Sequence, residues 1–291
     1  MCGLFGFVNY GNKLSEKEIN ELCSSLACES ELRGSHATGI AYFHKDKLNI
    51  SKNAVPAHKV NFKIKERVPV LIGHTRHATQ GAASHNQNNH PFSGRTKDKT
   101  LFALAHNGVL FNDDSLKKRF KLPKTKIETD SFVAVQLLET KRSLNPESLA
   151  FMAEQVRGSF TFTVLDSKQN LYIVKGDSPF ALIHFKSIGL YVYASTDEIL
   201  WRALASTHLL QEVKKCVKAK DDIDIISIPE GRIVTINPEG ELSESFFEYR
   251  DYYGYNWWNY GCYSSGKAKH EDVTVSEYDD IEYFDSICQV A

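Results

Sequence analysis

The stretch that begins at residue 159 constrains the fold most, because its apolar and polar side chains alternate with period two. It reads SFTFTVLD, NLYIVKG, FALIHF and GLYVYAS, with the short connections DSKQN and KSIG. Alternating runs joined by loops of this length predict β-hairpins. Helical patterns are grouped elsewhere rather than alternating with strands, so we expect an α+β fold of stacked layers and mainly antiparallel sheets.

Other segments predict the remaining elements of the same layers. Ser15 and Glu18 stand in capping-box spacing at the start of a helix over residues 16–32. A second helix is expected to start at Thr129 or Asp130, and a third at Ser195 or Thr196. Strands are expected over 3–8, over 68–74, within LFALAHNGVL where the run ends at HNG, and on both sides of the PEG turn at 229–231.

Composition and charge limit the classes of function. The chain has 291 residues, with 35 Lys and Arg against 36 Asp and Glu, so its charge favours neither nucleic acid nor an anionic membrane as a partner. Six cysteines are scattered along the sequence, and neither a signal peptide nor an apolar run of about 20 residues is visible. We expect a cytoplasmic protein with reduced thiols.

A change of composition near residue 249 predicts a domain boundary. Residues 1–248 form the expected domain, and residues 249–291 form a tail that is first aromatic and then acidic. The aromatic part could dock on a partner protein or fold back on its own domain, and the sequence favours neither. Its acidic continuation disfavours base stacking on nucleic acid.

Cys2 follows the initiator methionine directly, which makes it a candidate nucleophile. Removal of Met1 would leave a residue that carries both a thiol and a free α-amine. The amine has an unperturbed pKa near 8 and could take the proton of the neighbouring thiol. Taken alone, the position of this cysteine is explained as well by chance.

Three further motifs place chemically useful side chains near expected strand or helix ends. Arg76 in HTRHATQG could bind a carboxylate with its planar fork. Asn107 and Gly108 in HNG could donate two N–H groups to an oxyanion. Asp130 in ETD could bind an ammonium group. Each has a simpler explanation, namely a surface salt bridge, a turn and a helix N-cap.

The histidines of the same region do not predict a metal centre. His74, His77, His85 and His90 follow no structural zinc spacing, and the stretch lacks carboxylates that could orient histidine ligands. We expect neither a metal nor a cofactor.

Six motifs occur in one order that resembles the class II glutamine amidotransferase domain, a member of the N-terminal nucleophile hydrolases. These motifs are CGLFG at 2–6, RGSHATG at 33–39, HTRHATQG at 74–81, NHPF at 89–92, HNG at 106–108 and ETDS at 128–131. The resemblance covers roughly residues 2–240. It implies a four-layer αββα sandwich and hydrolysis of the glutamine side-chain amide, the ammonia-producing reaction of glucosamine-6-phosphate synthase, amidophosphoribosyltransferase and asparagine synthetase.

The resemblance also implies catalytic roles. Cys2 is the nucleophile that forms a γ-glutamyl thioester, and its α-amine is the base. Asn107 and Gly108 form the oxyanion hole.

The remaining implied roles concern the binding of glutamine. Arg76 binds the α-carboxylate of glutamine, and Asp130 binds the α-ammonium group. His77 and Thr79 line the pocket, mainly through backbone groups. The loop from His77 to His90 is implied to cover the bound substrate.

The sequence departs from the family pattern at two positions. His36 stands where several relatives carry aspartate, and His77 stands where the sugar-phosphate synthase carries tryptophan. The structure of these loops therefore does not follow from the resemblance.

Three functions remain open at this point. The first is a glutaminase or amidotransferase subunit that passes ammonia to an acceptor-processing partner protein. The others are an N-terminal nucleophile amidohydrolase on another amide, and a non-catalytic module that binds glutamine for regulation. The acceptor and the oligomeric state are not determined by the sequence.

Overall fold

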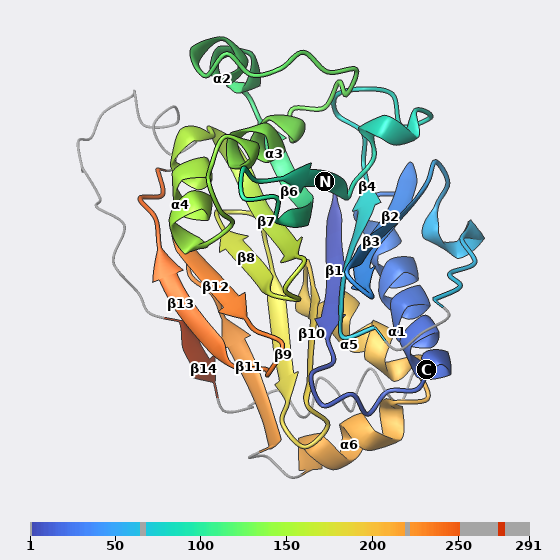
Figure 1. Ribbon diagram of the computed structural model, residues 1–291. Helices are drawn as coiled ribbons and strands as arrows, with labels where there is room; N and C mark the ends of the chain where they lie inside the picture. Colours follow the sequence, from blue (N-terminus) through green and yellow to red (C-terminus); the bar gives the residue numbers. More distant parts are fainter. Residues whose placement is uncertain (1, 65–67, 219–221, 251–272, 277–291) are drawn as a thin grey trace, which may run out of the picture.

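Two antiparallel sheets lie face to face in the computed structural model, with helices on the outer face of each (Figure 1). The structure describes residues 2–64, 68–218, 222–250 and 273–276. The eight-stranded sheet has the order β14-β11-β9-β10-β1-β4-β2-β3, and the six-stranded sheet has the order β13-β12-β8-β7-β6-β5. The predicted α+β sandwich is confirmed.

The strands of the eight-stranded sheet come from both ends of the described chain. They are β1 (Gly3–Val8), β2 (Ala37–His44), β3 (Lys47–Asn53), β4 (Val70–Arg76), β9 (Ala181–Phe185), β10 (Leu190–Ala194), β11 (Ile223–Ser227) and β14 (Thr274–Ser276). Those of the six-stranded sheet are β5 (Phe92–Arg95), β6 (Leu101–Leu110), β7 (Gly158–Asp166), β8 (Leu171–Lys175), β12 (Arg232–Ile236) and β13 (Leu242–Phe246).

The helices separate into two outer layers. Three of them are α1 (Glu16–Glu29), α5 (Asp197–Ala205) and α6 (Leu210–Lys218), and the other three are α2 (Asp113–Arg119), α3 (Phe132–Glu139) and α4 (Pro146–Gln155). Short 3₁₀ turns are η1 (Ser30–Leu32), η2 (Ala57–Lys59) and η3 (Asn86–Asn88). Side chains of α1 and α5 pack on the eight-stranded sheet, and those of α3 and α4 pack on the six-stranded sheet.

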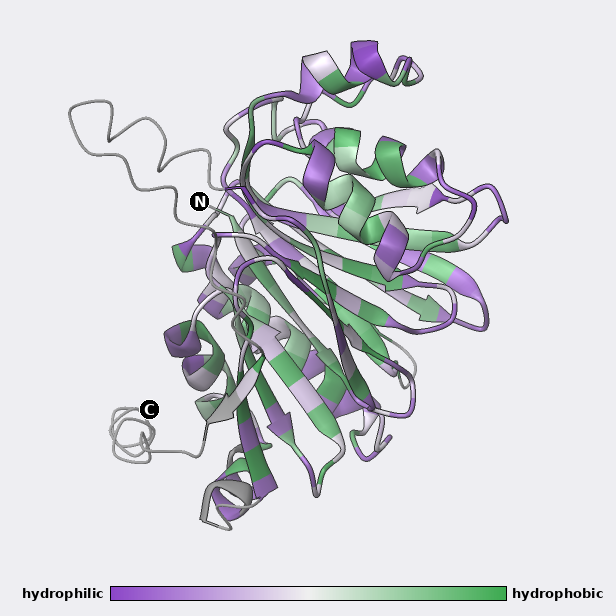
Figure 2. Ribbon diagram, turned by 90° about the vertical axis from the view of Figure 1, so that its left-hand side faces the viewer, coloured by the Kyte–Doolittle hydropathy of each residue, from purple (hydrophilic) through white to green (hydrophobic). Residues whose placement is uncertain are grey.

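Alternation along the strands explains why a third apolar cluster fills the space between the sheets. In β1, Phe5 and Phe7 pack toward α1, whereas Leu4 and Val8 point toward the other sheet. Hydrophobic stretches accordingly follow the strands in Figure 2, with polar stretches concentrated on the connections. The central strand β1 buries both faces because its sheet is covered on both sides, whereas the edge strands β3 and β13 are partly exposed.

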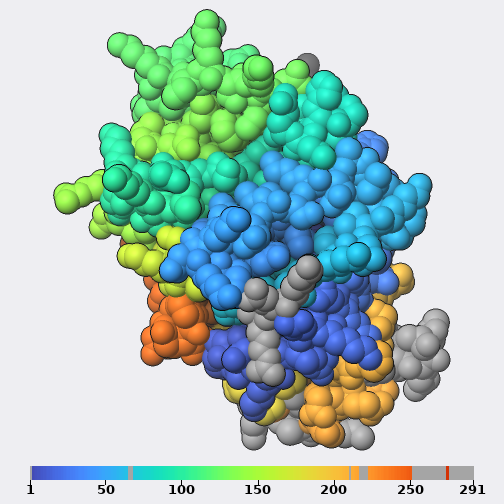
Figure 3. All heavy atoms as spheres, turned by 45° about the vertical axis from the view of Figure 1, so that its right-hand side comes forward, coloured from blue at the N-terminus to red at the C-terminus, as the bar shows by residue number. Residues whose placement is uncertain are grey.

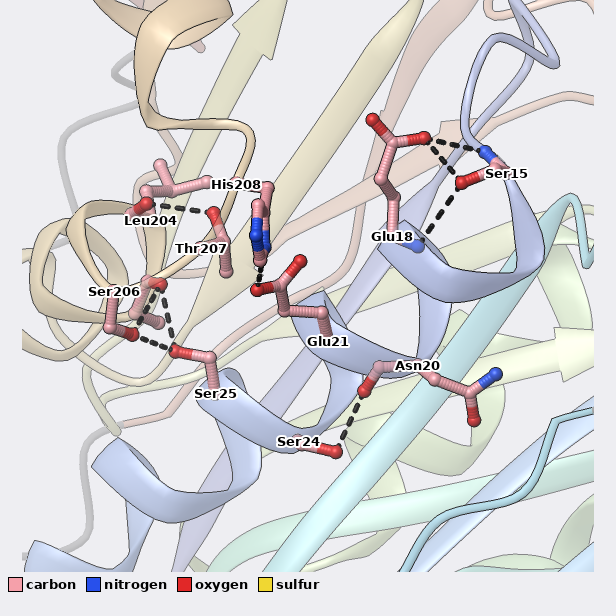
Figure 4. A network of polar contacts seen from close by, with 11 residues as sticks. Ser15, Glu18, Asn20, Glu21, Ser24, Ser25, Leu204, Ser206, Thr207 and His208 are labelled. Atoms are coloured by element: carbon pink, nitrogen blue, oxygen red, sulfur yellow. Dashed lines mark hydrogen bonds and ion pairs between the residues drawn. The ribbon is translucent and has the colours of Figure 1, made fainter.

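Helix α1 is fixed to the sandwich at both ends. Ser15 and Glu18 form the predicted capping box. Farther along the helix, Ser25 donates to the Ala203 carbonyl at 2.8 Å, and Glu21 contacts His208, as Figure 4 shows. The predicted helix over 16–32 ends earlier, because its last three residues form η1.

Two expected element boundaries are wrong. The HNG motif does not follow a strand but lies inside β6, because β7 pairs with β6 as far as Leu110, opposite Gly158. Asp130 is not a helix cap: α3 begins at Phe132, and the Asp130 carboxylate accepts a bond from the Leu110 N–H instead. Both differences arise from pairing between distant segments.

The hairpins expected after residue 159 are confirmed, but they belong to different sheets. Hairpin β7–β8 lies in the six-stranded sheet and β9–β10 in the eight-stranded sheet.

In the space-filling view, blue to teal segments from the first third of the chain form a continuous surface across the middle of the molecule (Figure 3).

The predicted division at residue 248 remains a prediction. Tyr249 packs its ring against Phe160 at 5.7 Å between centroids, and β14 pairs with β11. The aromatic residues expected to dock or fold back, including Trp257 and Trp258, lie outside the described residues.

Helix α5 follows a serine that ties β1 to its neighbours. Thr196 caps the helix, and the hydroxyl of Ser195 accepts a buried bond of 2.8 Å from the Leu4 N–H. The substitution Ser195→Ala leaves this donor without a partner, and we expect the free energy of unfolding to fall by about 1–3 kcal/mol. Chemical denaturation measures the change. The exposed Ser93→Ala is the matched control, expected within about 0.5 kcal/mol of wild type; equal losses in both would refute the assignment.

Candidate active site

Cys2 lies beside the end of β4 because β1 and β4 are antiparallel. Their register pairs Gly3 with Thr75, so the residue before Gly3 lies next to Arg76 and His77. The Cys2 sulfur lies 3.4 Å from the His77 nitrogen and 3.5 Å from its carbonyl oxygen. Arg33 donates through Nε to the Cys2 carbonyl at 2.9 Å. Cys2 is thus held from two sides.

A pocket opens at this point between the two sheets. It is lined by Cys2, Arg76, His77, Thr79, Gln80, His90, His106, Gly108, Thr129, Asp130 and Ser131. Six of the seven predicted site residues therefore border one cavity, although they are up to 128 positions apart in the sequence. The seventh, Asn107, does not line it.

Asn107 lies directly before the pocket residue Gly108 on β6. The alternation of β6 turns Ala103 and Ala105 toward the space between the sheets, and Asn107 continues on that face. Its side chain is fully buried, and among the described residues neither its amide nitrogen nor its oxygen has a hydrogen-bond partner. An unpaired buried amide is costly, which makes it a candidate for binding a ligand atom.

Gly108 is required by the backbone. Its φ is +143°, and a Cβ added there would lie 2.0 Å from the carbonyl oxygen of Ser159. Phe160 lies opposite Gly108 on β7. Its N–H donates to the Asp177 carboxylate, and its carbonyl accepts from the Gly176 N–H. Phe160 therefore directs its backbone groups away from β6, and the Gly108 N–H is left out of this pairing.

Arg76 is buried and prearranged by the loop that follows it. One terminal nitrogen donates to Asn89 Oδ1 at 2.7 Å, and the other donates to the carbonyls of Gln80 and Gly81 at 2.6 and 2.8 Å. Asn88 ties the same loop to Glu128 through its amide at 2.8 Å. The loop over residues 77–90 is therefore folded against the segment that leads to Asp130.

Asp130 is held by two donors. Oδ2 accepts from the Leu110 N–H at 2.6 Å, and Oδ1 accepts from the Ser131 hydroxyl at 3.3 Å. Ser131 also contacts His106 Nδ1 at 2.7 Å. Asn89 and Ser131 thus orient the two oppositely charged groups of the pocket. Both belong to motifs noted in the sequence, but only their contacts reveal these roles.

Buried histidines form the wall behind Arg76. His74 Nε2 contacts the His106 carbonyl at 3.0 Å, and the His74 and His90 rings lie 4.2 Å apart between centroids. Burial lowers the pKa of His74 to about 3 and that of His90 well below its usual range. These imidazoles are neutral at physiological pH, so they add no positive charge beside Arg76.

The described residues were expected to hold no metal site. Among them, no group of three or more His, Cys, Asp and Glu side chains is arranged to hold a metal ion. None of the described helices is both long and apolar enough to span a membrane.

Comparisons with known proteins agree with this fold. A family profile described as a glutamine amidotransferase domain matches residues 74–202. Glutamine–fructose-6-phosphate aminotransferase of Staphylococcus aureus is 30% identical over 253 residues, which cover 84% of this chain and 38% of that protein. The same enzyme of Bacillus cereus is 32% identical over 187 residues, covering 62% of this chain and 30% of its own.

Solved structures show the same fold at lower identity. Glutamine phosphoribosylpyrophosphate amidotransferase from B. subtilis matches with a TM-score of 0.62 and 20% identity, covering 84% of this chain and 49% of that one. An allosteric regulatory enzyme of purine biosynthesis matches with a TM-score of 0.64 and 19% identity, with the same two coverages. The fold is that of the N-terminal nucleophile hydrolases.

The chain contains a class II glutamine amidotransferase domain. It spans about two fifths of the length of the S. aureus relative.

The environment of Cys2 predicts how its reactivity depends on pH. Burial raises the pKa of the thiol, while the His77 N–H and the charge of Arg76 oppose that shift and Asp130 adds to it. Because the net shift is upward, the thiol is protonated at neutral pH. We expect its alkylation by iodoacetamide to keep accelerating above about pH 8.5, where an ordinary cysteine begins to level off. Peptide mass spectrometry follows the rate, with glutathione as reference; a plateau below neutral pH would contradict the assignment.

Proposed function

We propose that this domain hydrolyses the side-chain amide of glutamine to glutamate and ammonia, with Cys2 as the nucleophile. The observation that carries the proposal is the unpaired, buried amide of Asn107 beside a pocket with Cys2 on one wall. An enzyme that forms a tetrahedral intermediate needs donors where the oxyanion develops. The unpaired side-chain amide of Asn107 and the Gly108 N–H, which does not bond to Phe160, are suited to that role.

The first step requires a base because the Cys2 thiol is protonated at rest. Removal of Met1 would give Cys2 an α-amine whose ordinary pKa is near 8. The amine takes the thiol proton as the sulfur attacks the side-chain carbonyl carbon of glutamine. The new oxyanion accepts bonds from Asn107 Nδ2 and the Gly108 N–H.

Collapse of this intermediate releases ammonia. The α-ammonium group of Cys2 returns its proton to the departing nitrogen, and a γ-glutamyl thioester remains on the sulfur. The free amine then activates a water molecule, which cleaves the thioester to glutamate and regenerates the thiol. The loop over residues 77–90 excludes bulk water while the ammonia forms.

Two opposite charges in the pocket support recognition of an amino acid. Arg76 would pair with the α-carboxylate and Asp130 with the α-ammonium group. Both side chains are at least 96% buried, so a ligand that lacks either charge leaves the buried Arg76 or Asp130 with its neutral hydrogen-bond partners but without an opposite charge. A buried charge without an opposite charge weakens binding strongly. His77 and Thr79 complete the rim, His77 through its backbone.

The name of a relative suggests a fate for the ammonia. The S. aureus enzyme is named for the transfer of nitrogen from glutamine to fructose 6-phosphate. We propose that the ammonia formed here is likewise passed on, to an acceptor-processing partner protein. A cytoplasmic location would keep the Cys2 thiol reduced, and we propose residues 1–248 as the glutaminase unit.

Labelling by 6-diazo-5-oxo-L-norleucine, an alkylating mimic of glutamine, tests the proposal. We expect one adduct on an amino-terminal Cys2 by intact and peptide mass spectrometry, together with glutamate release from glutamine. The Cys2→Ala variant should show neither. Retention of Met1 would overturn the proposed base. Turnover of amides that lack an α-charge, with no turnover of glutamine, would instead identify an amidohydrolase of another specificity.

The oxyanion donors can be tested separately from binding. The substitution Asn107→Ala should lower kcat for glutamine hydrolysis by about 10²–10³, because one donor is lost in the transition state. KM should change by less than about threefold, since the ground-state amide needs the donor little. Steady-state kinetics measure both constants.

Two further variants complete this test. Asn107→Asp keeps the shape of the side chain but places a negative charge beside the oxyanion, so it should be at least as slow. Asn49 on β3 is half-buried and does not line the pocket, so Asn49→Ala is the matched control and should leave both constants unchanged. A rise in KM alone for Asn107→Ala would reject the oxyanion role.

A further inference from the structure

The two positions at which the sequence departs from the family pattern are in direct contact. His36 lies in the loop before β2 and His77 in the loop after β4. Their imidazole rings stack with centroids 4.9 Å apart and planes inclined by 24°. Both side chains are exposed, so burial does not explain why the rings meet.

His36 also forms two hydrogen bonds to the chain on either side of His77. Its backbone N–H donates to the Arg76 carbonyl at 2.9 Å, and its ring atom Nδ1 accepts from the Ala78 N–H at 3.0 Å. The loop can approach this closely because residue 34 is glycine, where a Cβ would lie 2.5 Å from the His77 nitrogen. His36 thus contacts three consecutive residues, the last residue of β4 and the two that follow it.

The segment held by His36 carries the peptide group that touches the Cys2 sulfur. The His77 N–H points at the sulfur from 3.4 Å, and the carbonyl of His77 lies 3.5 Å from it. A hydrogen bond from a backbone N–H stabilises a thiolate more than a thiol. A displacement of the His77 peptide would therefore change both the position and the ionisation of the sulfur.

We propose that His36 is a positioning residue that holds the His77–Ala78 backbone against Cys2 through its Nδ1 acceptor and its stacked ring. This inference rests on the proposed role of Cys2 as the nucleophile. His36 acts through the backbone of its neighbours and does not touch the substrate.

The acceptor role restricts the protonation state of His36. Only neutral imidazole with its proton on Nε2 can accept at Nδ1, because both nitrogens of an imidazolium are donors.

Three substitutions separate the acceptor from the stacked ring. Asn places an amide oxygen near the position of Nδ1 but neither stacks nor titrates. Phe retains the ring but has no acceptor, and Ala has neither. The exposed His58→Ala is the control for loss of a surface histidine. The backbone bond to Arg76 remains in every variant, and thermal unfolding checks that each is folded.

We measure the rate of Cys2 alkylation by iodoacetamide and kcat/KM for glutamine. His36→Ala and His36→Phe should lose about three- to tenfold in both, the factor expected for one hydrogen bond. His36→Asn should recover most of that loss.

The two readouts distinguish failure of this inference from failure of the proposed function. Alkylation needs no substrate, so the order of the variants tests His36 even if glutamine is not hydrolysed. Equal rates for the Asn, Phe and Ala variants, or variants of all three kinds that react as fast as wild type, would overturn the positioning role. The expected order of alkylation rates among the variants, without any glutaminase activity, would overturn the proposed function alone.

Discussion

The antiparallel pairing of β1 with β4 is the constraint on which the site depends. In such a pair the first residue of one strand lies opposite the last residues of the other. The register of Gly3 with Thr75 therefore brings the sulfur of Cys2 to the peptide of His77, and it places Arg76 beside them at the end of β4. The thiol, the cation and the loop that follows are set by one row of backbone hydrogen bonds.

The second sheet supplies the complementary half of the pocket. Strand β6 turns Asn107 toward the first sheet, and the Leu110 N–H fixes the carboxylate of Asp130. The buried contact between His74 and the His106 carbonyl links the two sheets behind the pocket. Gly108 and Asp130 thus line the pocket together with Cys2 and Arg76.

Burial determines the electrostatics of the pocket. It keeps the thiol protonated and the neighbouring histidines neutral, because removing a charge from water is costly. Arg76 and Asp130 stay buried because each has fixed hydrogen-bond partners. The pocket is therefore neutral at the Cys2 sulfur and carries two opposite charges, at Arg76 and at Asp130.

The sequence by itself determined the layered class of the fold, the hairpins after residue 159, the capping box of α1 and the residues around the pocket. These features depend on period-two patterns, on local hydrogen bonds and on ordered motifs. Only the tertiary structure decided that HNG lies within a strand and that the Asp130 carboxylate accepts a bond from β6 instead of capping a helix. It also decided that Asn89 and Ser131 contact the charged groups of Arg76 and Asp130. It also brought His36 onto His77. Each of these depends on a contact between segments far apart in the chain, and local sequence patterns do not encode which distant donor an acceptor will meet.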